Sequence, residues 1–323
     1  MVVWTGWLIL MITGDRWALL AEGWPMTLTM IVGSFIAGAT SEGGGAVAFP
    51  VMTLGLGITP AVARDFSLMI QSIGMTAAAF TIVRTRTPIS WRALRWASLG
   101  GAAGVILGLE FVAPFVPPPS VKVLFTSLWL SFAVALVLIN RNHDRAILER
   151  LPALENHQRA LLVGVGVVGG VITSLTGSGL DILTFSVLVL GFGLSEKVGT
   201  PTSVVLMAGN AVVGAVWKGT FGAGLEPEAW MWWYAAVPVV VVGAPLGARF
   251  IQGQPRIRIV AFLIFSILAQ FLAGILIIPQ TPERIALSVV TFSIGATVFV
   301  VMSQLGAARV RRAAGPYSST TQV

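Results

Sequence analysis

The chain contains no cysteine and only two histidines, which removes several classes of function at once. Without cysteine it can form no disulfide, no thiolate metal site and no cysteine nucleophile. His143 and His157 both lie in the most charged loop, and we interpret them as solvated loop residues. The sequence also lacks a Ser/His/Asp set, an HExxH motif and a phosphate-binding loop. We therefore expect no enzyme activity, no metal and no cofactor.

Charge is equally scarce. Charged residues make up 10% of the 323 residues and hydrophobic residues 56%, whereas about a quarter of a soluble domain is charged. Several apolar runs approach the roughly 20 residues that cross a bilayer, and lipid forces such runs to be helical. The sequence thus predicts an all-α polytopic membrane protein. Its net charge of +7 comes from Lys and Arg in the loops between apolar runs, so we expect the lipid bilayer, and no nucleic acid, as a partner.

Residues 1–25 form a separate N-terminal segment. The apolar run MVVWTGWLILMI is interrupted at Gly14, Asp15 and Arg16, and it has no basic start and no clear cleavage site. We interpret it as a poor first helix that spans the membrane or lies in its interface, with four tryptophans at headgroup level: Trp4, Trp7, Trp17 and Trp24. A cleaved signal peptide is the alternative.

The rest of the chain is duplicated. LGLGITPAVARDFSLMI (54–70) aligns with LGFGLSEKVGTPTSVVL (190–206), and PSVKVLF (119–125) aligns with PRIRIVA (255–261), both at the same offset along the chain. The constant offset predicts a first repeat over 26–140, a cytoplasmic linker over 141–158 and a second repeat over 159–278. An extra transmembrane helix over 279–305 and a basic cytoplasmic tail over 306–323 follow.

Positive charge predicts the orientation. Arginines gather at 84–95, 141–159, 249–258 and 309–312, and by the positive-inside rule these segments and the C-terminus are cytoplasmic. Counting spans between them makes 26–57 and 159–193 hairpins that enter from opposite sides, broken at GGG (43–45) and GSG (177–179). Each repeat is then a glycine-broken helical hairpin plus three transmembrane helices, and the two repeats are inverted. Inverted repeats with broken helices are typical of secondary transporters.

The breaks offer donors to a small anion. Free backbone N–H groups at a helix start favour negative charge, and glycine lets a ligand approach the main chain. The candidate substrate-binding residues in the two breaks are Thr40, Ser41, Gly43, Gly44, Gly45, Thr176, Gly177, Ser178 and Gly179. Polar residues in the following spans could complete the site, namely Ser67, Gln71, Thr202, Ser203 and Asn210. The alternative is that the glycines pack helices and the polar groups cap or cross-link them.

Two acids lie at membrane depth, Glu42 and Asp181. A charge at the bilayer centre costs roughly 2.5 to 3.5 kcal/mol, so such residues are functional candidates. A buried carboxyl group is more easily kept protonated, and it could then donate to an anion or carry a proton. We expect Glu42 and Asp181 to be proton-coupling residues, with capping of its own half-helix as the alternative role of Asp181.

The sequence resembles the sulfite exporter TauE/SafE-like family, also called TSUP permeases. The resemblance covers about residues 27–278 and is carried by GGGAVAFP (43–50), LGLGITPAVA (54–63), SLTGSGLDILTFSVLVLGFGLSEKVGTPTS (174–203) and GAPLG (243–247). It implies a bacterial inner-membrane permease for sulfite or organosulfonates, and the glycine breaks, Thr202 and Ser203 match the family pattern. Two positions depart from that pattern. Glu42 stands where the family usually has an apolar residue, and Phe66 and Ser67 are the first-half counterparts of Thr202 and Ser203.

We therefore expect a secondary transporter that exports a small sulfur-containing oxyanion, with the proton as candidate coupling ion. One alternative is an anion channel that uses the breaks as its filter. Another is a non-transporting scaffold or sensor. Monomer and homodimer both stay open.

Overall fold

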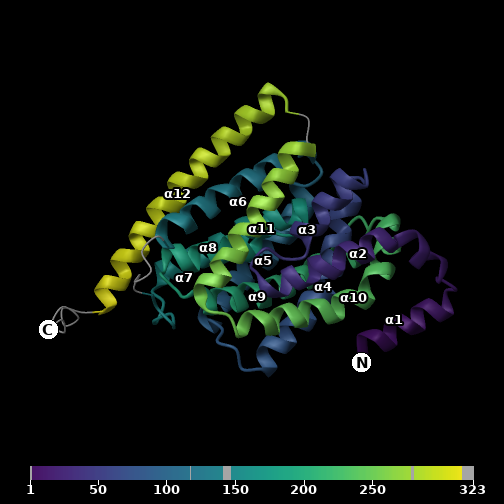
Figure 1. Ribbon diagram of the computed structural model, residues 1–323, viewed down its shortest axis with the longest axis horizontal. Coiled ribbons are helices and arrows are strands. Elements are labelled where there is room, and N and C mark those ends of the chain that lie inside the picture. The colour runs from purple at the N-terminus through teal and green to yellow at the C-terminus, as the bar shows by residue number, and fades with distance from the viewer. Residues whose placement is uncertain (1, 117, 141–146, 278–279, 315–323) are drawn as a thin grey trace.

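The computed structural model describes residues 2–116, 118–140, 147–277 and 280–314, and these are almost entirely helical (Figure 1). The described residues form twelve α-helices: α1 (Val2–Thr13), α2 (Ala18–Ala39), α3 (Gly45–Pro50), α4 (Pro60–Arg84), α5 (Trp91–Phe111), α6 (Pro118–Asn140), α7 (Asn156–Thr176), α8 (Leu180–Ser186), α9 (Glu196–Thr220), α10 (Pro227–Gln252), α11 (Arg256–Ile277) and α12 (Pro282–Ala314). Two π-helical turns follow the short helices: η1 (Val51–Gly55) and η2 (Val187–Gly191).

Eight of these helices are long and apolar enough to cross a membrane: α2, α4, α6, α7, α9, α10, α11 and α12. The expectation of an all-α polytopic membrane protein is thereby confirmed. Helix α5 has 21 residues but is not among these eight, and Arg92, Arg95 and Glu110 lie in it. Large apolar side chains are exposed along the outer helices, as lipid contact requires.

The expected N-terminal segment, residues 1–25, contains helix α1 and the start of helix α2. Helix α1 has 12 residues, about 18 Å at 1.5 Å per residue, and cannot cross a hydrocarbon core of about 30 Å. It lies against α10, where Trp7 Nε1 donates to the Tyr234 carbonyl oxygen at 2.9 Å. Helix α2 already begins at Ala18, before the expected start at residue 26, and continues through Pro25. Membrane helices tolerate proline because neighbouring groups satisfy the freed carbonyl.

The two halves of the chain contain the same series of elements. The turns η1 and η2 begin at Val51 and Val187, and the offset between them is also the offset between the starts of α4 and α9. Gly57 and Gly193, at the same offset, each lie two residues after the end of a π-helical turn, with φ of 69° and 71°. Equivalent sequences therefore fold into equivalent local structures.

Close helix packing ties the halves together. Helix α5 of the first half packs on α7 of the second, and α10 of the second half packs on α2 of the first. At both crossings glycine faces a neighbouring backbone; a Cβ on Gly170 would lie 2.5 Å from the Gly101 carbonyl oxygen, and one on Gly104 or Gly247 would overlap a carbonyl outright. Small residues let membrane helices approach this closely.

An outer layer of α6, α11 and α12 covers one side of the bundle. Helix α12 runs the length of α6 (Figure 1) and continues to Ala314, beyond the expected end at residue 305. Its outward side carries a stripe of exposed apolar residues, including Val289, Ile294 and Val301. The last part of the expected tail, 315–323, lies outside the described residues.

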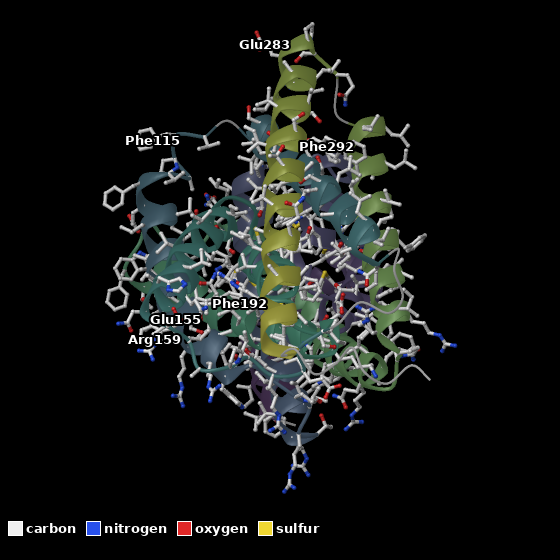
Figure 2. All side chains as sticks on the ribbon, turned by 90° about the vertical axis from the view of Figure 1, so that its left-hand side faces the viewer. Phe115, Glu155, Arg159, Phe192, Glu283 and Phe292 are labelled. Carbon is white, nitrogen blue, oxygen red and sulfur yellow. The ribbon has the colours of Figure 1, made fainter. Side chains whose placement is uncertain are left out.

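The basic loops gather at one end of the molecule. Nitrogen-bearing side chains project from the lower end in Figure 2, while Glu283 lies at the upper end. Three contacts join the loops there: Gln252 Nε2 donates to Thr85 Oγ1 at 2.9 Å, Arg256 pairs with Glu196 at 3.4 Å, and Leu148 pairs with Leu194 through the backbone. His157 is exposed near this end, whereas His143 lies outside the described residues. One shared basic end is what the positive-inside rule expects of cytoplasmic loops.

The packing predicts unequal effects of two glycine substitutions in α5 and α7. A Cβ on Gly104 would overlap the Val167 carbonyl, whereas one on Gly164 would meet nothing within 4 Å. We expect Gly104→Ala to lower the free energy of unfolding by about 1 to 3 kcal/mol. Gly164→Ala should leave it unchanged or slightly higher, because alanine favours the helix. Thermal unfolding in detergent measures both; equal melting temperatures for the two variants would contradict this packing.

Candidate functional site

The two helix breaks meet at one buried place. Helix α2 ends at Ala39 and α3 begins at Gly45, while α7 ends at Thr176 and α8 begins at Leu180. Ser178 Oγ, in the second break, donates to the Glu42 carbonyl oxygen in the first at 2.7 Å. Both residues are at most 1% exposed. The second half of the chain thus satisfies a backbone carbonyl of the first half inside the buried bundle.

Each break is shaped by a threonine at the end of the preceding helix. Thr40 Oγ1 donates to the Ile36 carbonyl and accepts from the Glu42 N–H at 3.3 Å. Thr176 Oγ1 lies at the matching place, donating to the Ser178 carbonyl at 2.6 Å and accepting from the Ser178 N–H at 3.4 Å. These side chains replace the helical hydrogen bonds lost at the break.

Helix α4 closes the site from the side. Gln71 Nε2 donates to the Ser67 carbonyl at 3.0 Å and to the Gly177 carbonyl. A Cβ on Gly177 would overlap the Ser67 side chain, so Ser67 lies directly against the second break. The structure therefore brings these two predicted residues to the breaks.

Asp181 caps its own half-helix. Its Oδ1 accepts from the N–H groups of Gly179 and Ile182, both at 3.0 Å. A carboxylate in the first turn of a helix is stabilised by the helix dipole. These contacts match the capping role that the sequence left open.

Glu42 points away from the second break, toward α11. Its Oε2 accepts from Ser266 Oγ and from Gln270 Nε2, the latter at 2.9 Å. Sequence reasoning missed both partners. A signal was present, because Ser266 and Gln270 are polar residues four apart, hence on one face, in the most apolar of the eight candidate spans.

The three predicted residues on α9 are Thr202, Ser203 and Asn210. The first two lie apart from the helix breaks, and the third lies near the second break. Thr202 Oγ1 donates to the Val198 carbonyl and accepts from the Ser90 N–H at 2.9 Å, and Ser203 Oγ donates to the Thr200 carbonyl. No hydrogen bond among the described residues joins either to the breaks. Asn210 is closer: a Cβ on Gly101 would lie 2.5 Å from Leu180 in α8, next to the second break, and 3.2 Å from Asn210 Oδ1.

In this conformation the site is closed. The hydroxyl groups predicted to donate to an anion donate to backbone carbonyls instead: those of Thr40, Ser67, Thr176, Ser178, Thr202 and Ser203. The buried side-chain atoms left without a hydrogen-bond partner include Ser41 Oγ, Glu42 Oε1, Gln71 Oε1 and both amide atoms of Asn210. Buried polar atoms without partners are rare, so these four residues are candidate ligand contacts.

An ionic cluster lies immediately beside the second break. Asp65, fully buried, pairs with Arg64 Nε at 3.0 Å and with Lys218 Nζ, and it accepts from the Glu226 N–H at 2.9 Å. A Cβ on Gly177 would lie 3.1 Å from the Arg64 carbonyl oxygen, so the cluster adjoins the break. The cluster joins α4 of the first half to α9 of the second.

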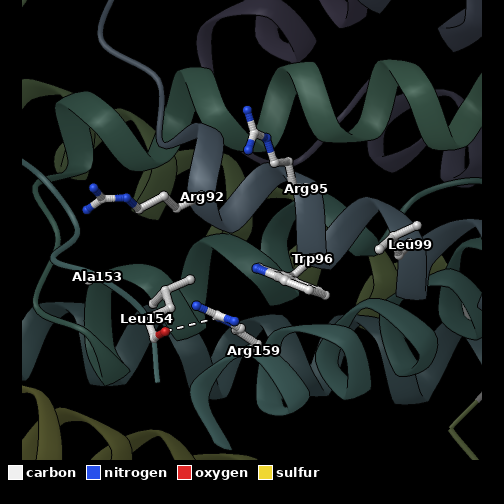
Figure 3. Close-up of a pocket in the computed structure, with 7 residues that line it drawn as sticks. All are labelled: Arg92, Arg95, Trp96, Leu99, Ala153, Leu154 and Arg159. Carbon is white, nitrogen blue, oxygen red and sulfur yellow. Dashed lines mark hydrogen bonds between the residues drawn. The ribbon is translucent and has the colours of Figure 1, made fainter. Parts of the chain in front are cut away.

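The basic end carries open cavities. One, of about 590 Å³, is lined by Arg92, Arg95 and Arg159 around Trp96 (Figure 3). Another, of about 260 Å³, lies between the ends of α4, α9, α10 and α11 and is lined in part by Arg86, Lys197 and Thr200. Clustered positive charge raises the local concentration of small anions. No group of three or more His, Asp or Glu side chains that could hold a metal ion is found in the part of the chain that the structure describes.

Comparison with known proteins identifies a family. The family model described as Sulfite exporter TauE/SafE matches residues 26–272, more than three quarters of the chain. No curated protein and no solved structure matches.

The first break predicts opposite outcomes at neighbouring glycines. Gly43 has φ of 71°, and a Cβ there would lie within 2.6 Å of three oxygen atoms, whereas a Cβ on Gly44 would lie no closer than 3.5 Å to any atom. We expect Gly43→Ala to cost about 1 to 3 kcal/mol from backbone strain alone, and Gly44→Ala to be tolerated. Melting temperatures in detergent compare them. Equal destabilisation by both changes would show that the break has another shape.

The ionic cluster predicts a large effect at Asp65. Asp65→Asn leaves Lys218 and Arg64 without a buried counter-charge, so we expect a loss of about 3 to 5 kcal/mol in the free energy of unfolding. Glu228→Gln is the control, because Glu228 is an exposed acid in the first turn of α10, which begins next to Glu226. Thermal or denaturant unfolding measures the difference, and an Asp65→Asn protein as stable as the control would refute the cluster's role.

Proposed function

The chain belongs to the sulfite exporter TauE/SafE family, and we propose that it is a secondary transporter that exports a small sulfur-containing oxyanion, sulfite or an organosulfonate. Members of this family are membrane transporters of sulfur anions and not enzymes. The observation that carries the proposal is the meeting of the two helix breaks in one buried place, through Ser178 and the Glu42 carbonyl. Broken helices that meet inside a membrane protein are typical of transporter substrate sites.

The anion accepts hydrogen bonds from hydroxyl groups that donate to backbone carbonyls in the closed site. Thr40, Thr176 and Ser178 each donate to a carbonyl of a break, and a rotation about χ1 would turn such a hydroxyl toward a ligand. Ser41 and Asn210 already have unpartnered polar atoms. Neutral donors of this kind bind an oxyanion without a permanent ion pair, which allows its release.

Access alternates between the two ends of the molecule. The Asp65 cluster links α4 to α9 beside the second break and closes the site on that side, while cavities lined by Arg86, Arg92 and Lys197 lie open at the basic end. We place the basic end and the C-terminus in the cytoplasm of a bacterial inner membrane, following the positive-inside rule. The two repeats are inverted, and their relative motion breaks the cluster to open the other side. A basic entrance on the cytoplasmic side suits export, because it gathers anions where transport begins.

Glu42 carries the coupling proton. Its Oε2 is held by Ser266 and Gln270, while its buried Oε1 has no partner and is free to take a proton. The carboxyl group connects the first break to α11, so its charge state can bias how the outer layer packs on the hairpin. Asp181 is engaged as a cap, and in this scheme it does not carry the proton.

Transport in proteoliposomes tests the function and the role of Glu42. With wild-type protein we expect sulfite flux that saturates with concentration and is stimulated by an imposed pH gradient. Glu42→Gln should keep the contacts of Oε2 but lose the stimulation. Glu22→Gln is the control and should behave as wild type, because Glu22 is an exposed acid on α2, the helix that precedes the first break.

Three outcomes would count against the proposal. Flux that never saturates, with single-channel conductance, would indicate an anion channel instead. No flux of sulfite or any organosulfonate would remove the transport function. Glu42→Gln flux that still follows the pH gradient would leave transport standing and exclude Glu42 as the proton carrier.

A further inference from the structure

The cavity of about 590 Å³ at the basic end lies where α5 and α7 begin (Figure 3). Its α5 wall is formed by Arg92, Arg95, Trp96 and Leu99, whose spacing of three or four residues places them on one face of the helix. The facing wall consists of the loop before α7 and of Arg159 in the first turn of α7. Three of the described residues that line the cavity are therefore arginines, and none of them is acidic.

The loop before α7 holds two of these arginines in place. Arg92 Nη1 donates to the Leu151 carbonyl at 2.7 Å, and Arg159 Nε donates to the Leu154 carbonyl at 3.0 Å. The Arg159 guanidinium group also lies over the ring of Trp96, 5.6 Å from its centroid (Figure 3). An arginine side chain has five N–H donors, and the described residues accept from at most two in either side chain. Both groups are thus fixed by the fold and still have donors to offer.

The arginines of the cavity have no carboxylate partner among the described residues. None of the three takes part in a salt bridge there, and Arg95 has no hydrogen bond through its side chain either. The acid nearest to Arg159 in the sequence is Glu155, which is exposed and lies 3.1 Å from His157 Nδ1 through its Oε2. Three positive charges around one cavity repel each other, and an anion that enters it relieves the repulsion.

The cavity adjoins the lipid-facing surface of the bundle. Leu99 is 63% exposed, and at 1.5 Å per residue it lies about 6 Å farther along α5 than Arg95. Leu107 continues this exposed apolar surface on α5, as Leu161 and Val168 do on α7. Exposed apolar side chains of membrane helices contact acyl chains. Positive charge and an acyl-chain surface therefore meet within one helical turn.

We propose that this cavity binds the headgroup of an anionic phospholipid from the cytoplasmic leaflet. The lipid phosphate accepts charge-assisted hydrogen bonds from Arg92, Arg95 and Arg159, whose planar guanidinium groups fit a phosphate in bidentate geometry. The acyl chains follow Leu99 and Leu161 along α5 and α7. Basic pockets between membrane helices on the cytoplasmic side are typical sites for acidic lipid headgroups. The volume also lies within the range of about 300 to 1,000 Å³ of small-molecule sites.

The positive-inside rule explains the sign of the charge at this end but not this arrangement. Arg84 at the end of α4 and Arg258 near the start of α11 are also exposed at the basic end, and neither lines the cavity. They attract a negatively charged membrane surface in the same general way. A lipid that prefers the cavity must therefore depend on Arg95 and Arg159 more than on these two. A soluble anion meets the arginines alone and lacks the apolar part of the contact.

Binding is tested on the full-length protein in detergent, without any sulfur anion. We expect phosphatidylglycerol to raise the melting temperature more than an equal mole fraction of phosphatidylcholine does. Arg95→Gln and Arg159→Gln should each lower the apparent affinity for phosphatidylglycerol at least about ten-fold, because each removes a charge-assisted contact. Arg95 has no described side-chain partner to lose, so Arg95→Gln keeps the test valid if Arg159→Gln fails to fold. Arg84→Gln and Arg258→Gln remove the same charge at the same end and are the matched controls.

Three results would overturn the site. One is an equal melting temperature in the two lipids, and another is an equal loss of affinity in the control variants, which would show only general attraction to the basic end. The third concerns glycerol phosphate, which has the charge of the headgroup but no acyl chains. A rise in melting temperature with glycerol phosphate or sulfite that is lost in Arg95→Gln would assign the cavity to a soluble anion.

The lipid site and the transport function are tested independently. Binding of phosphatidylglycerol by a protein that shows no sulfite flux would keep this site and remove the transport function. Sulfite flux by a protein that does not distinguish the two lipids would do the reverse.

Discussion

Lipid offers the backbone no hydrogen-bond partner, and the structure depends on how the protein meets that requirement where its helices break. A break inside a membrane is stable only if protein groups satisfy the freed N–H and C=O groups. Thr40 donates to a carbonyl of its own helix, and Thr176 donates to a carbonyl of its own break. Ser178 and Gln71 each donate to a carbonyl of the break in the other half of the chain, Glu42 and Gly177 respectively. The same contacts that stabilise the breaks therefore join the two halves.

This arrangement gives the site a particular distribution of charge. The hydroxyl and amide donors are neutral, and the two acids are held in different ways. Asp181 faces N–H groups of its own helix, and Glu42 faces donors on α11. The buried ion pairs lie outside the breaks themselves: Asp65 pairs with Lys218 beside the second break, and Glu196 pairs with Arg256 at the basic end.

Two helix pairs pack closely across the halves, and the outer layer contacts the breaks through only a few side chains. The pairs α5 with α7 and α2 with α10 contact backbone to backbone through glycine, so each joins a helix of one half to a hairpin helix of the other. Such tight pairs resist sliding past each other, because a close-packed interface has little free volume. The outer layer of α6, α11 and α12 touches the site through Ser266 and Gln270 of α11, the partners of Glu42. That layer therefore contacts the first break directly through Glu42.

The sequence by itself determined the class of structure. Scarce charge and long apolar runs required membrane helices, and the constant offset between the aligned segments appears again between η1 and η2 and between α4 and α9. It also located the glycine breaks, because glycine at positive φ, as at Gly43 and Gly177, leaves a local signal. These features depend on neighbours in the chain, and a linear pattern records them.

The tertiary structure decided which groups meet. Residues Ser67 and Gln71 reach the breaks, whereas Thr202 and Ser203, equally polar and also on an interior helix, bond near the start of α9 instead. The side chain of Glu42 turns to Ser266 and Gln270, which lie far along the chain in α11, and Asp65 of the first half finds Lys218 in the second. Sequence patterns give the face of a helix but not the partner of that face, because helix-to-helix packing fixes the partner and is set by contacts summed over the whole bundle.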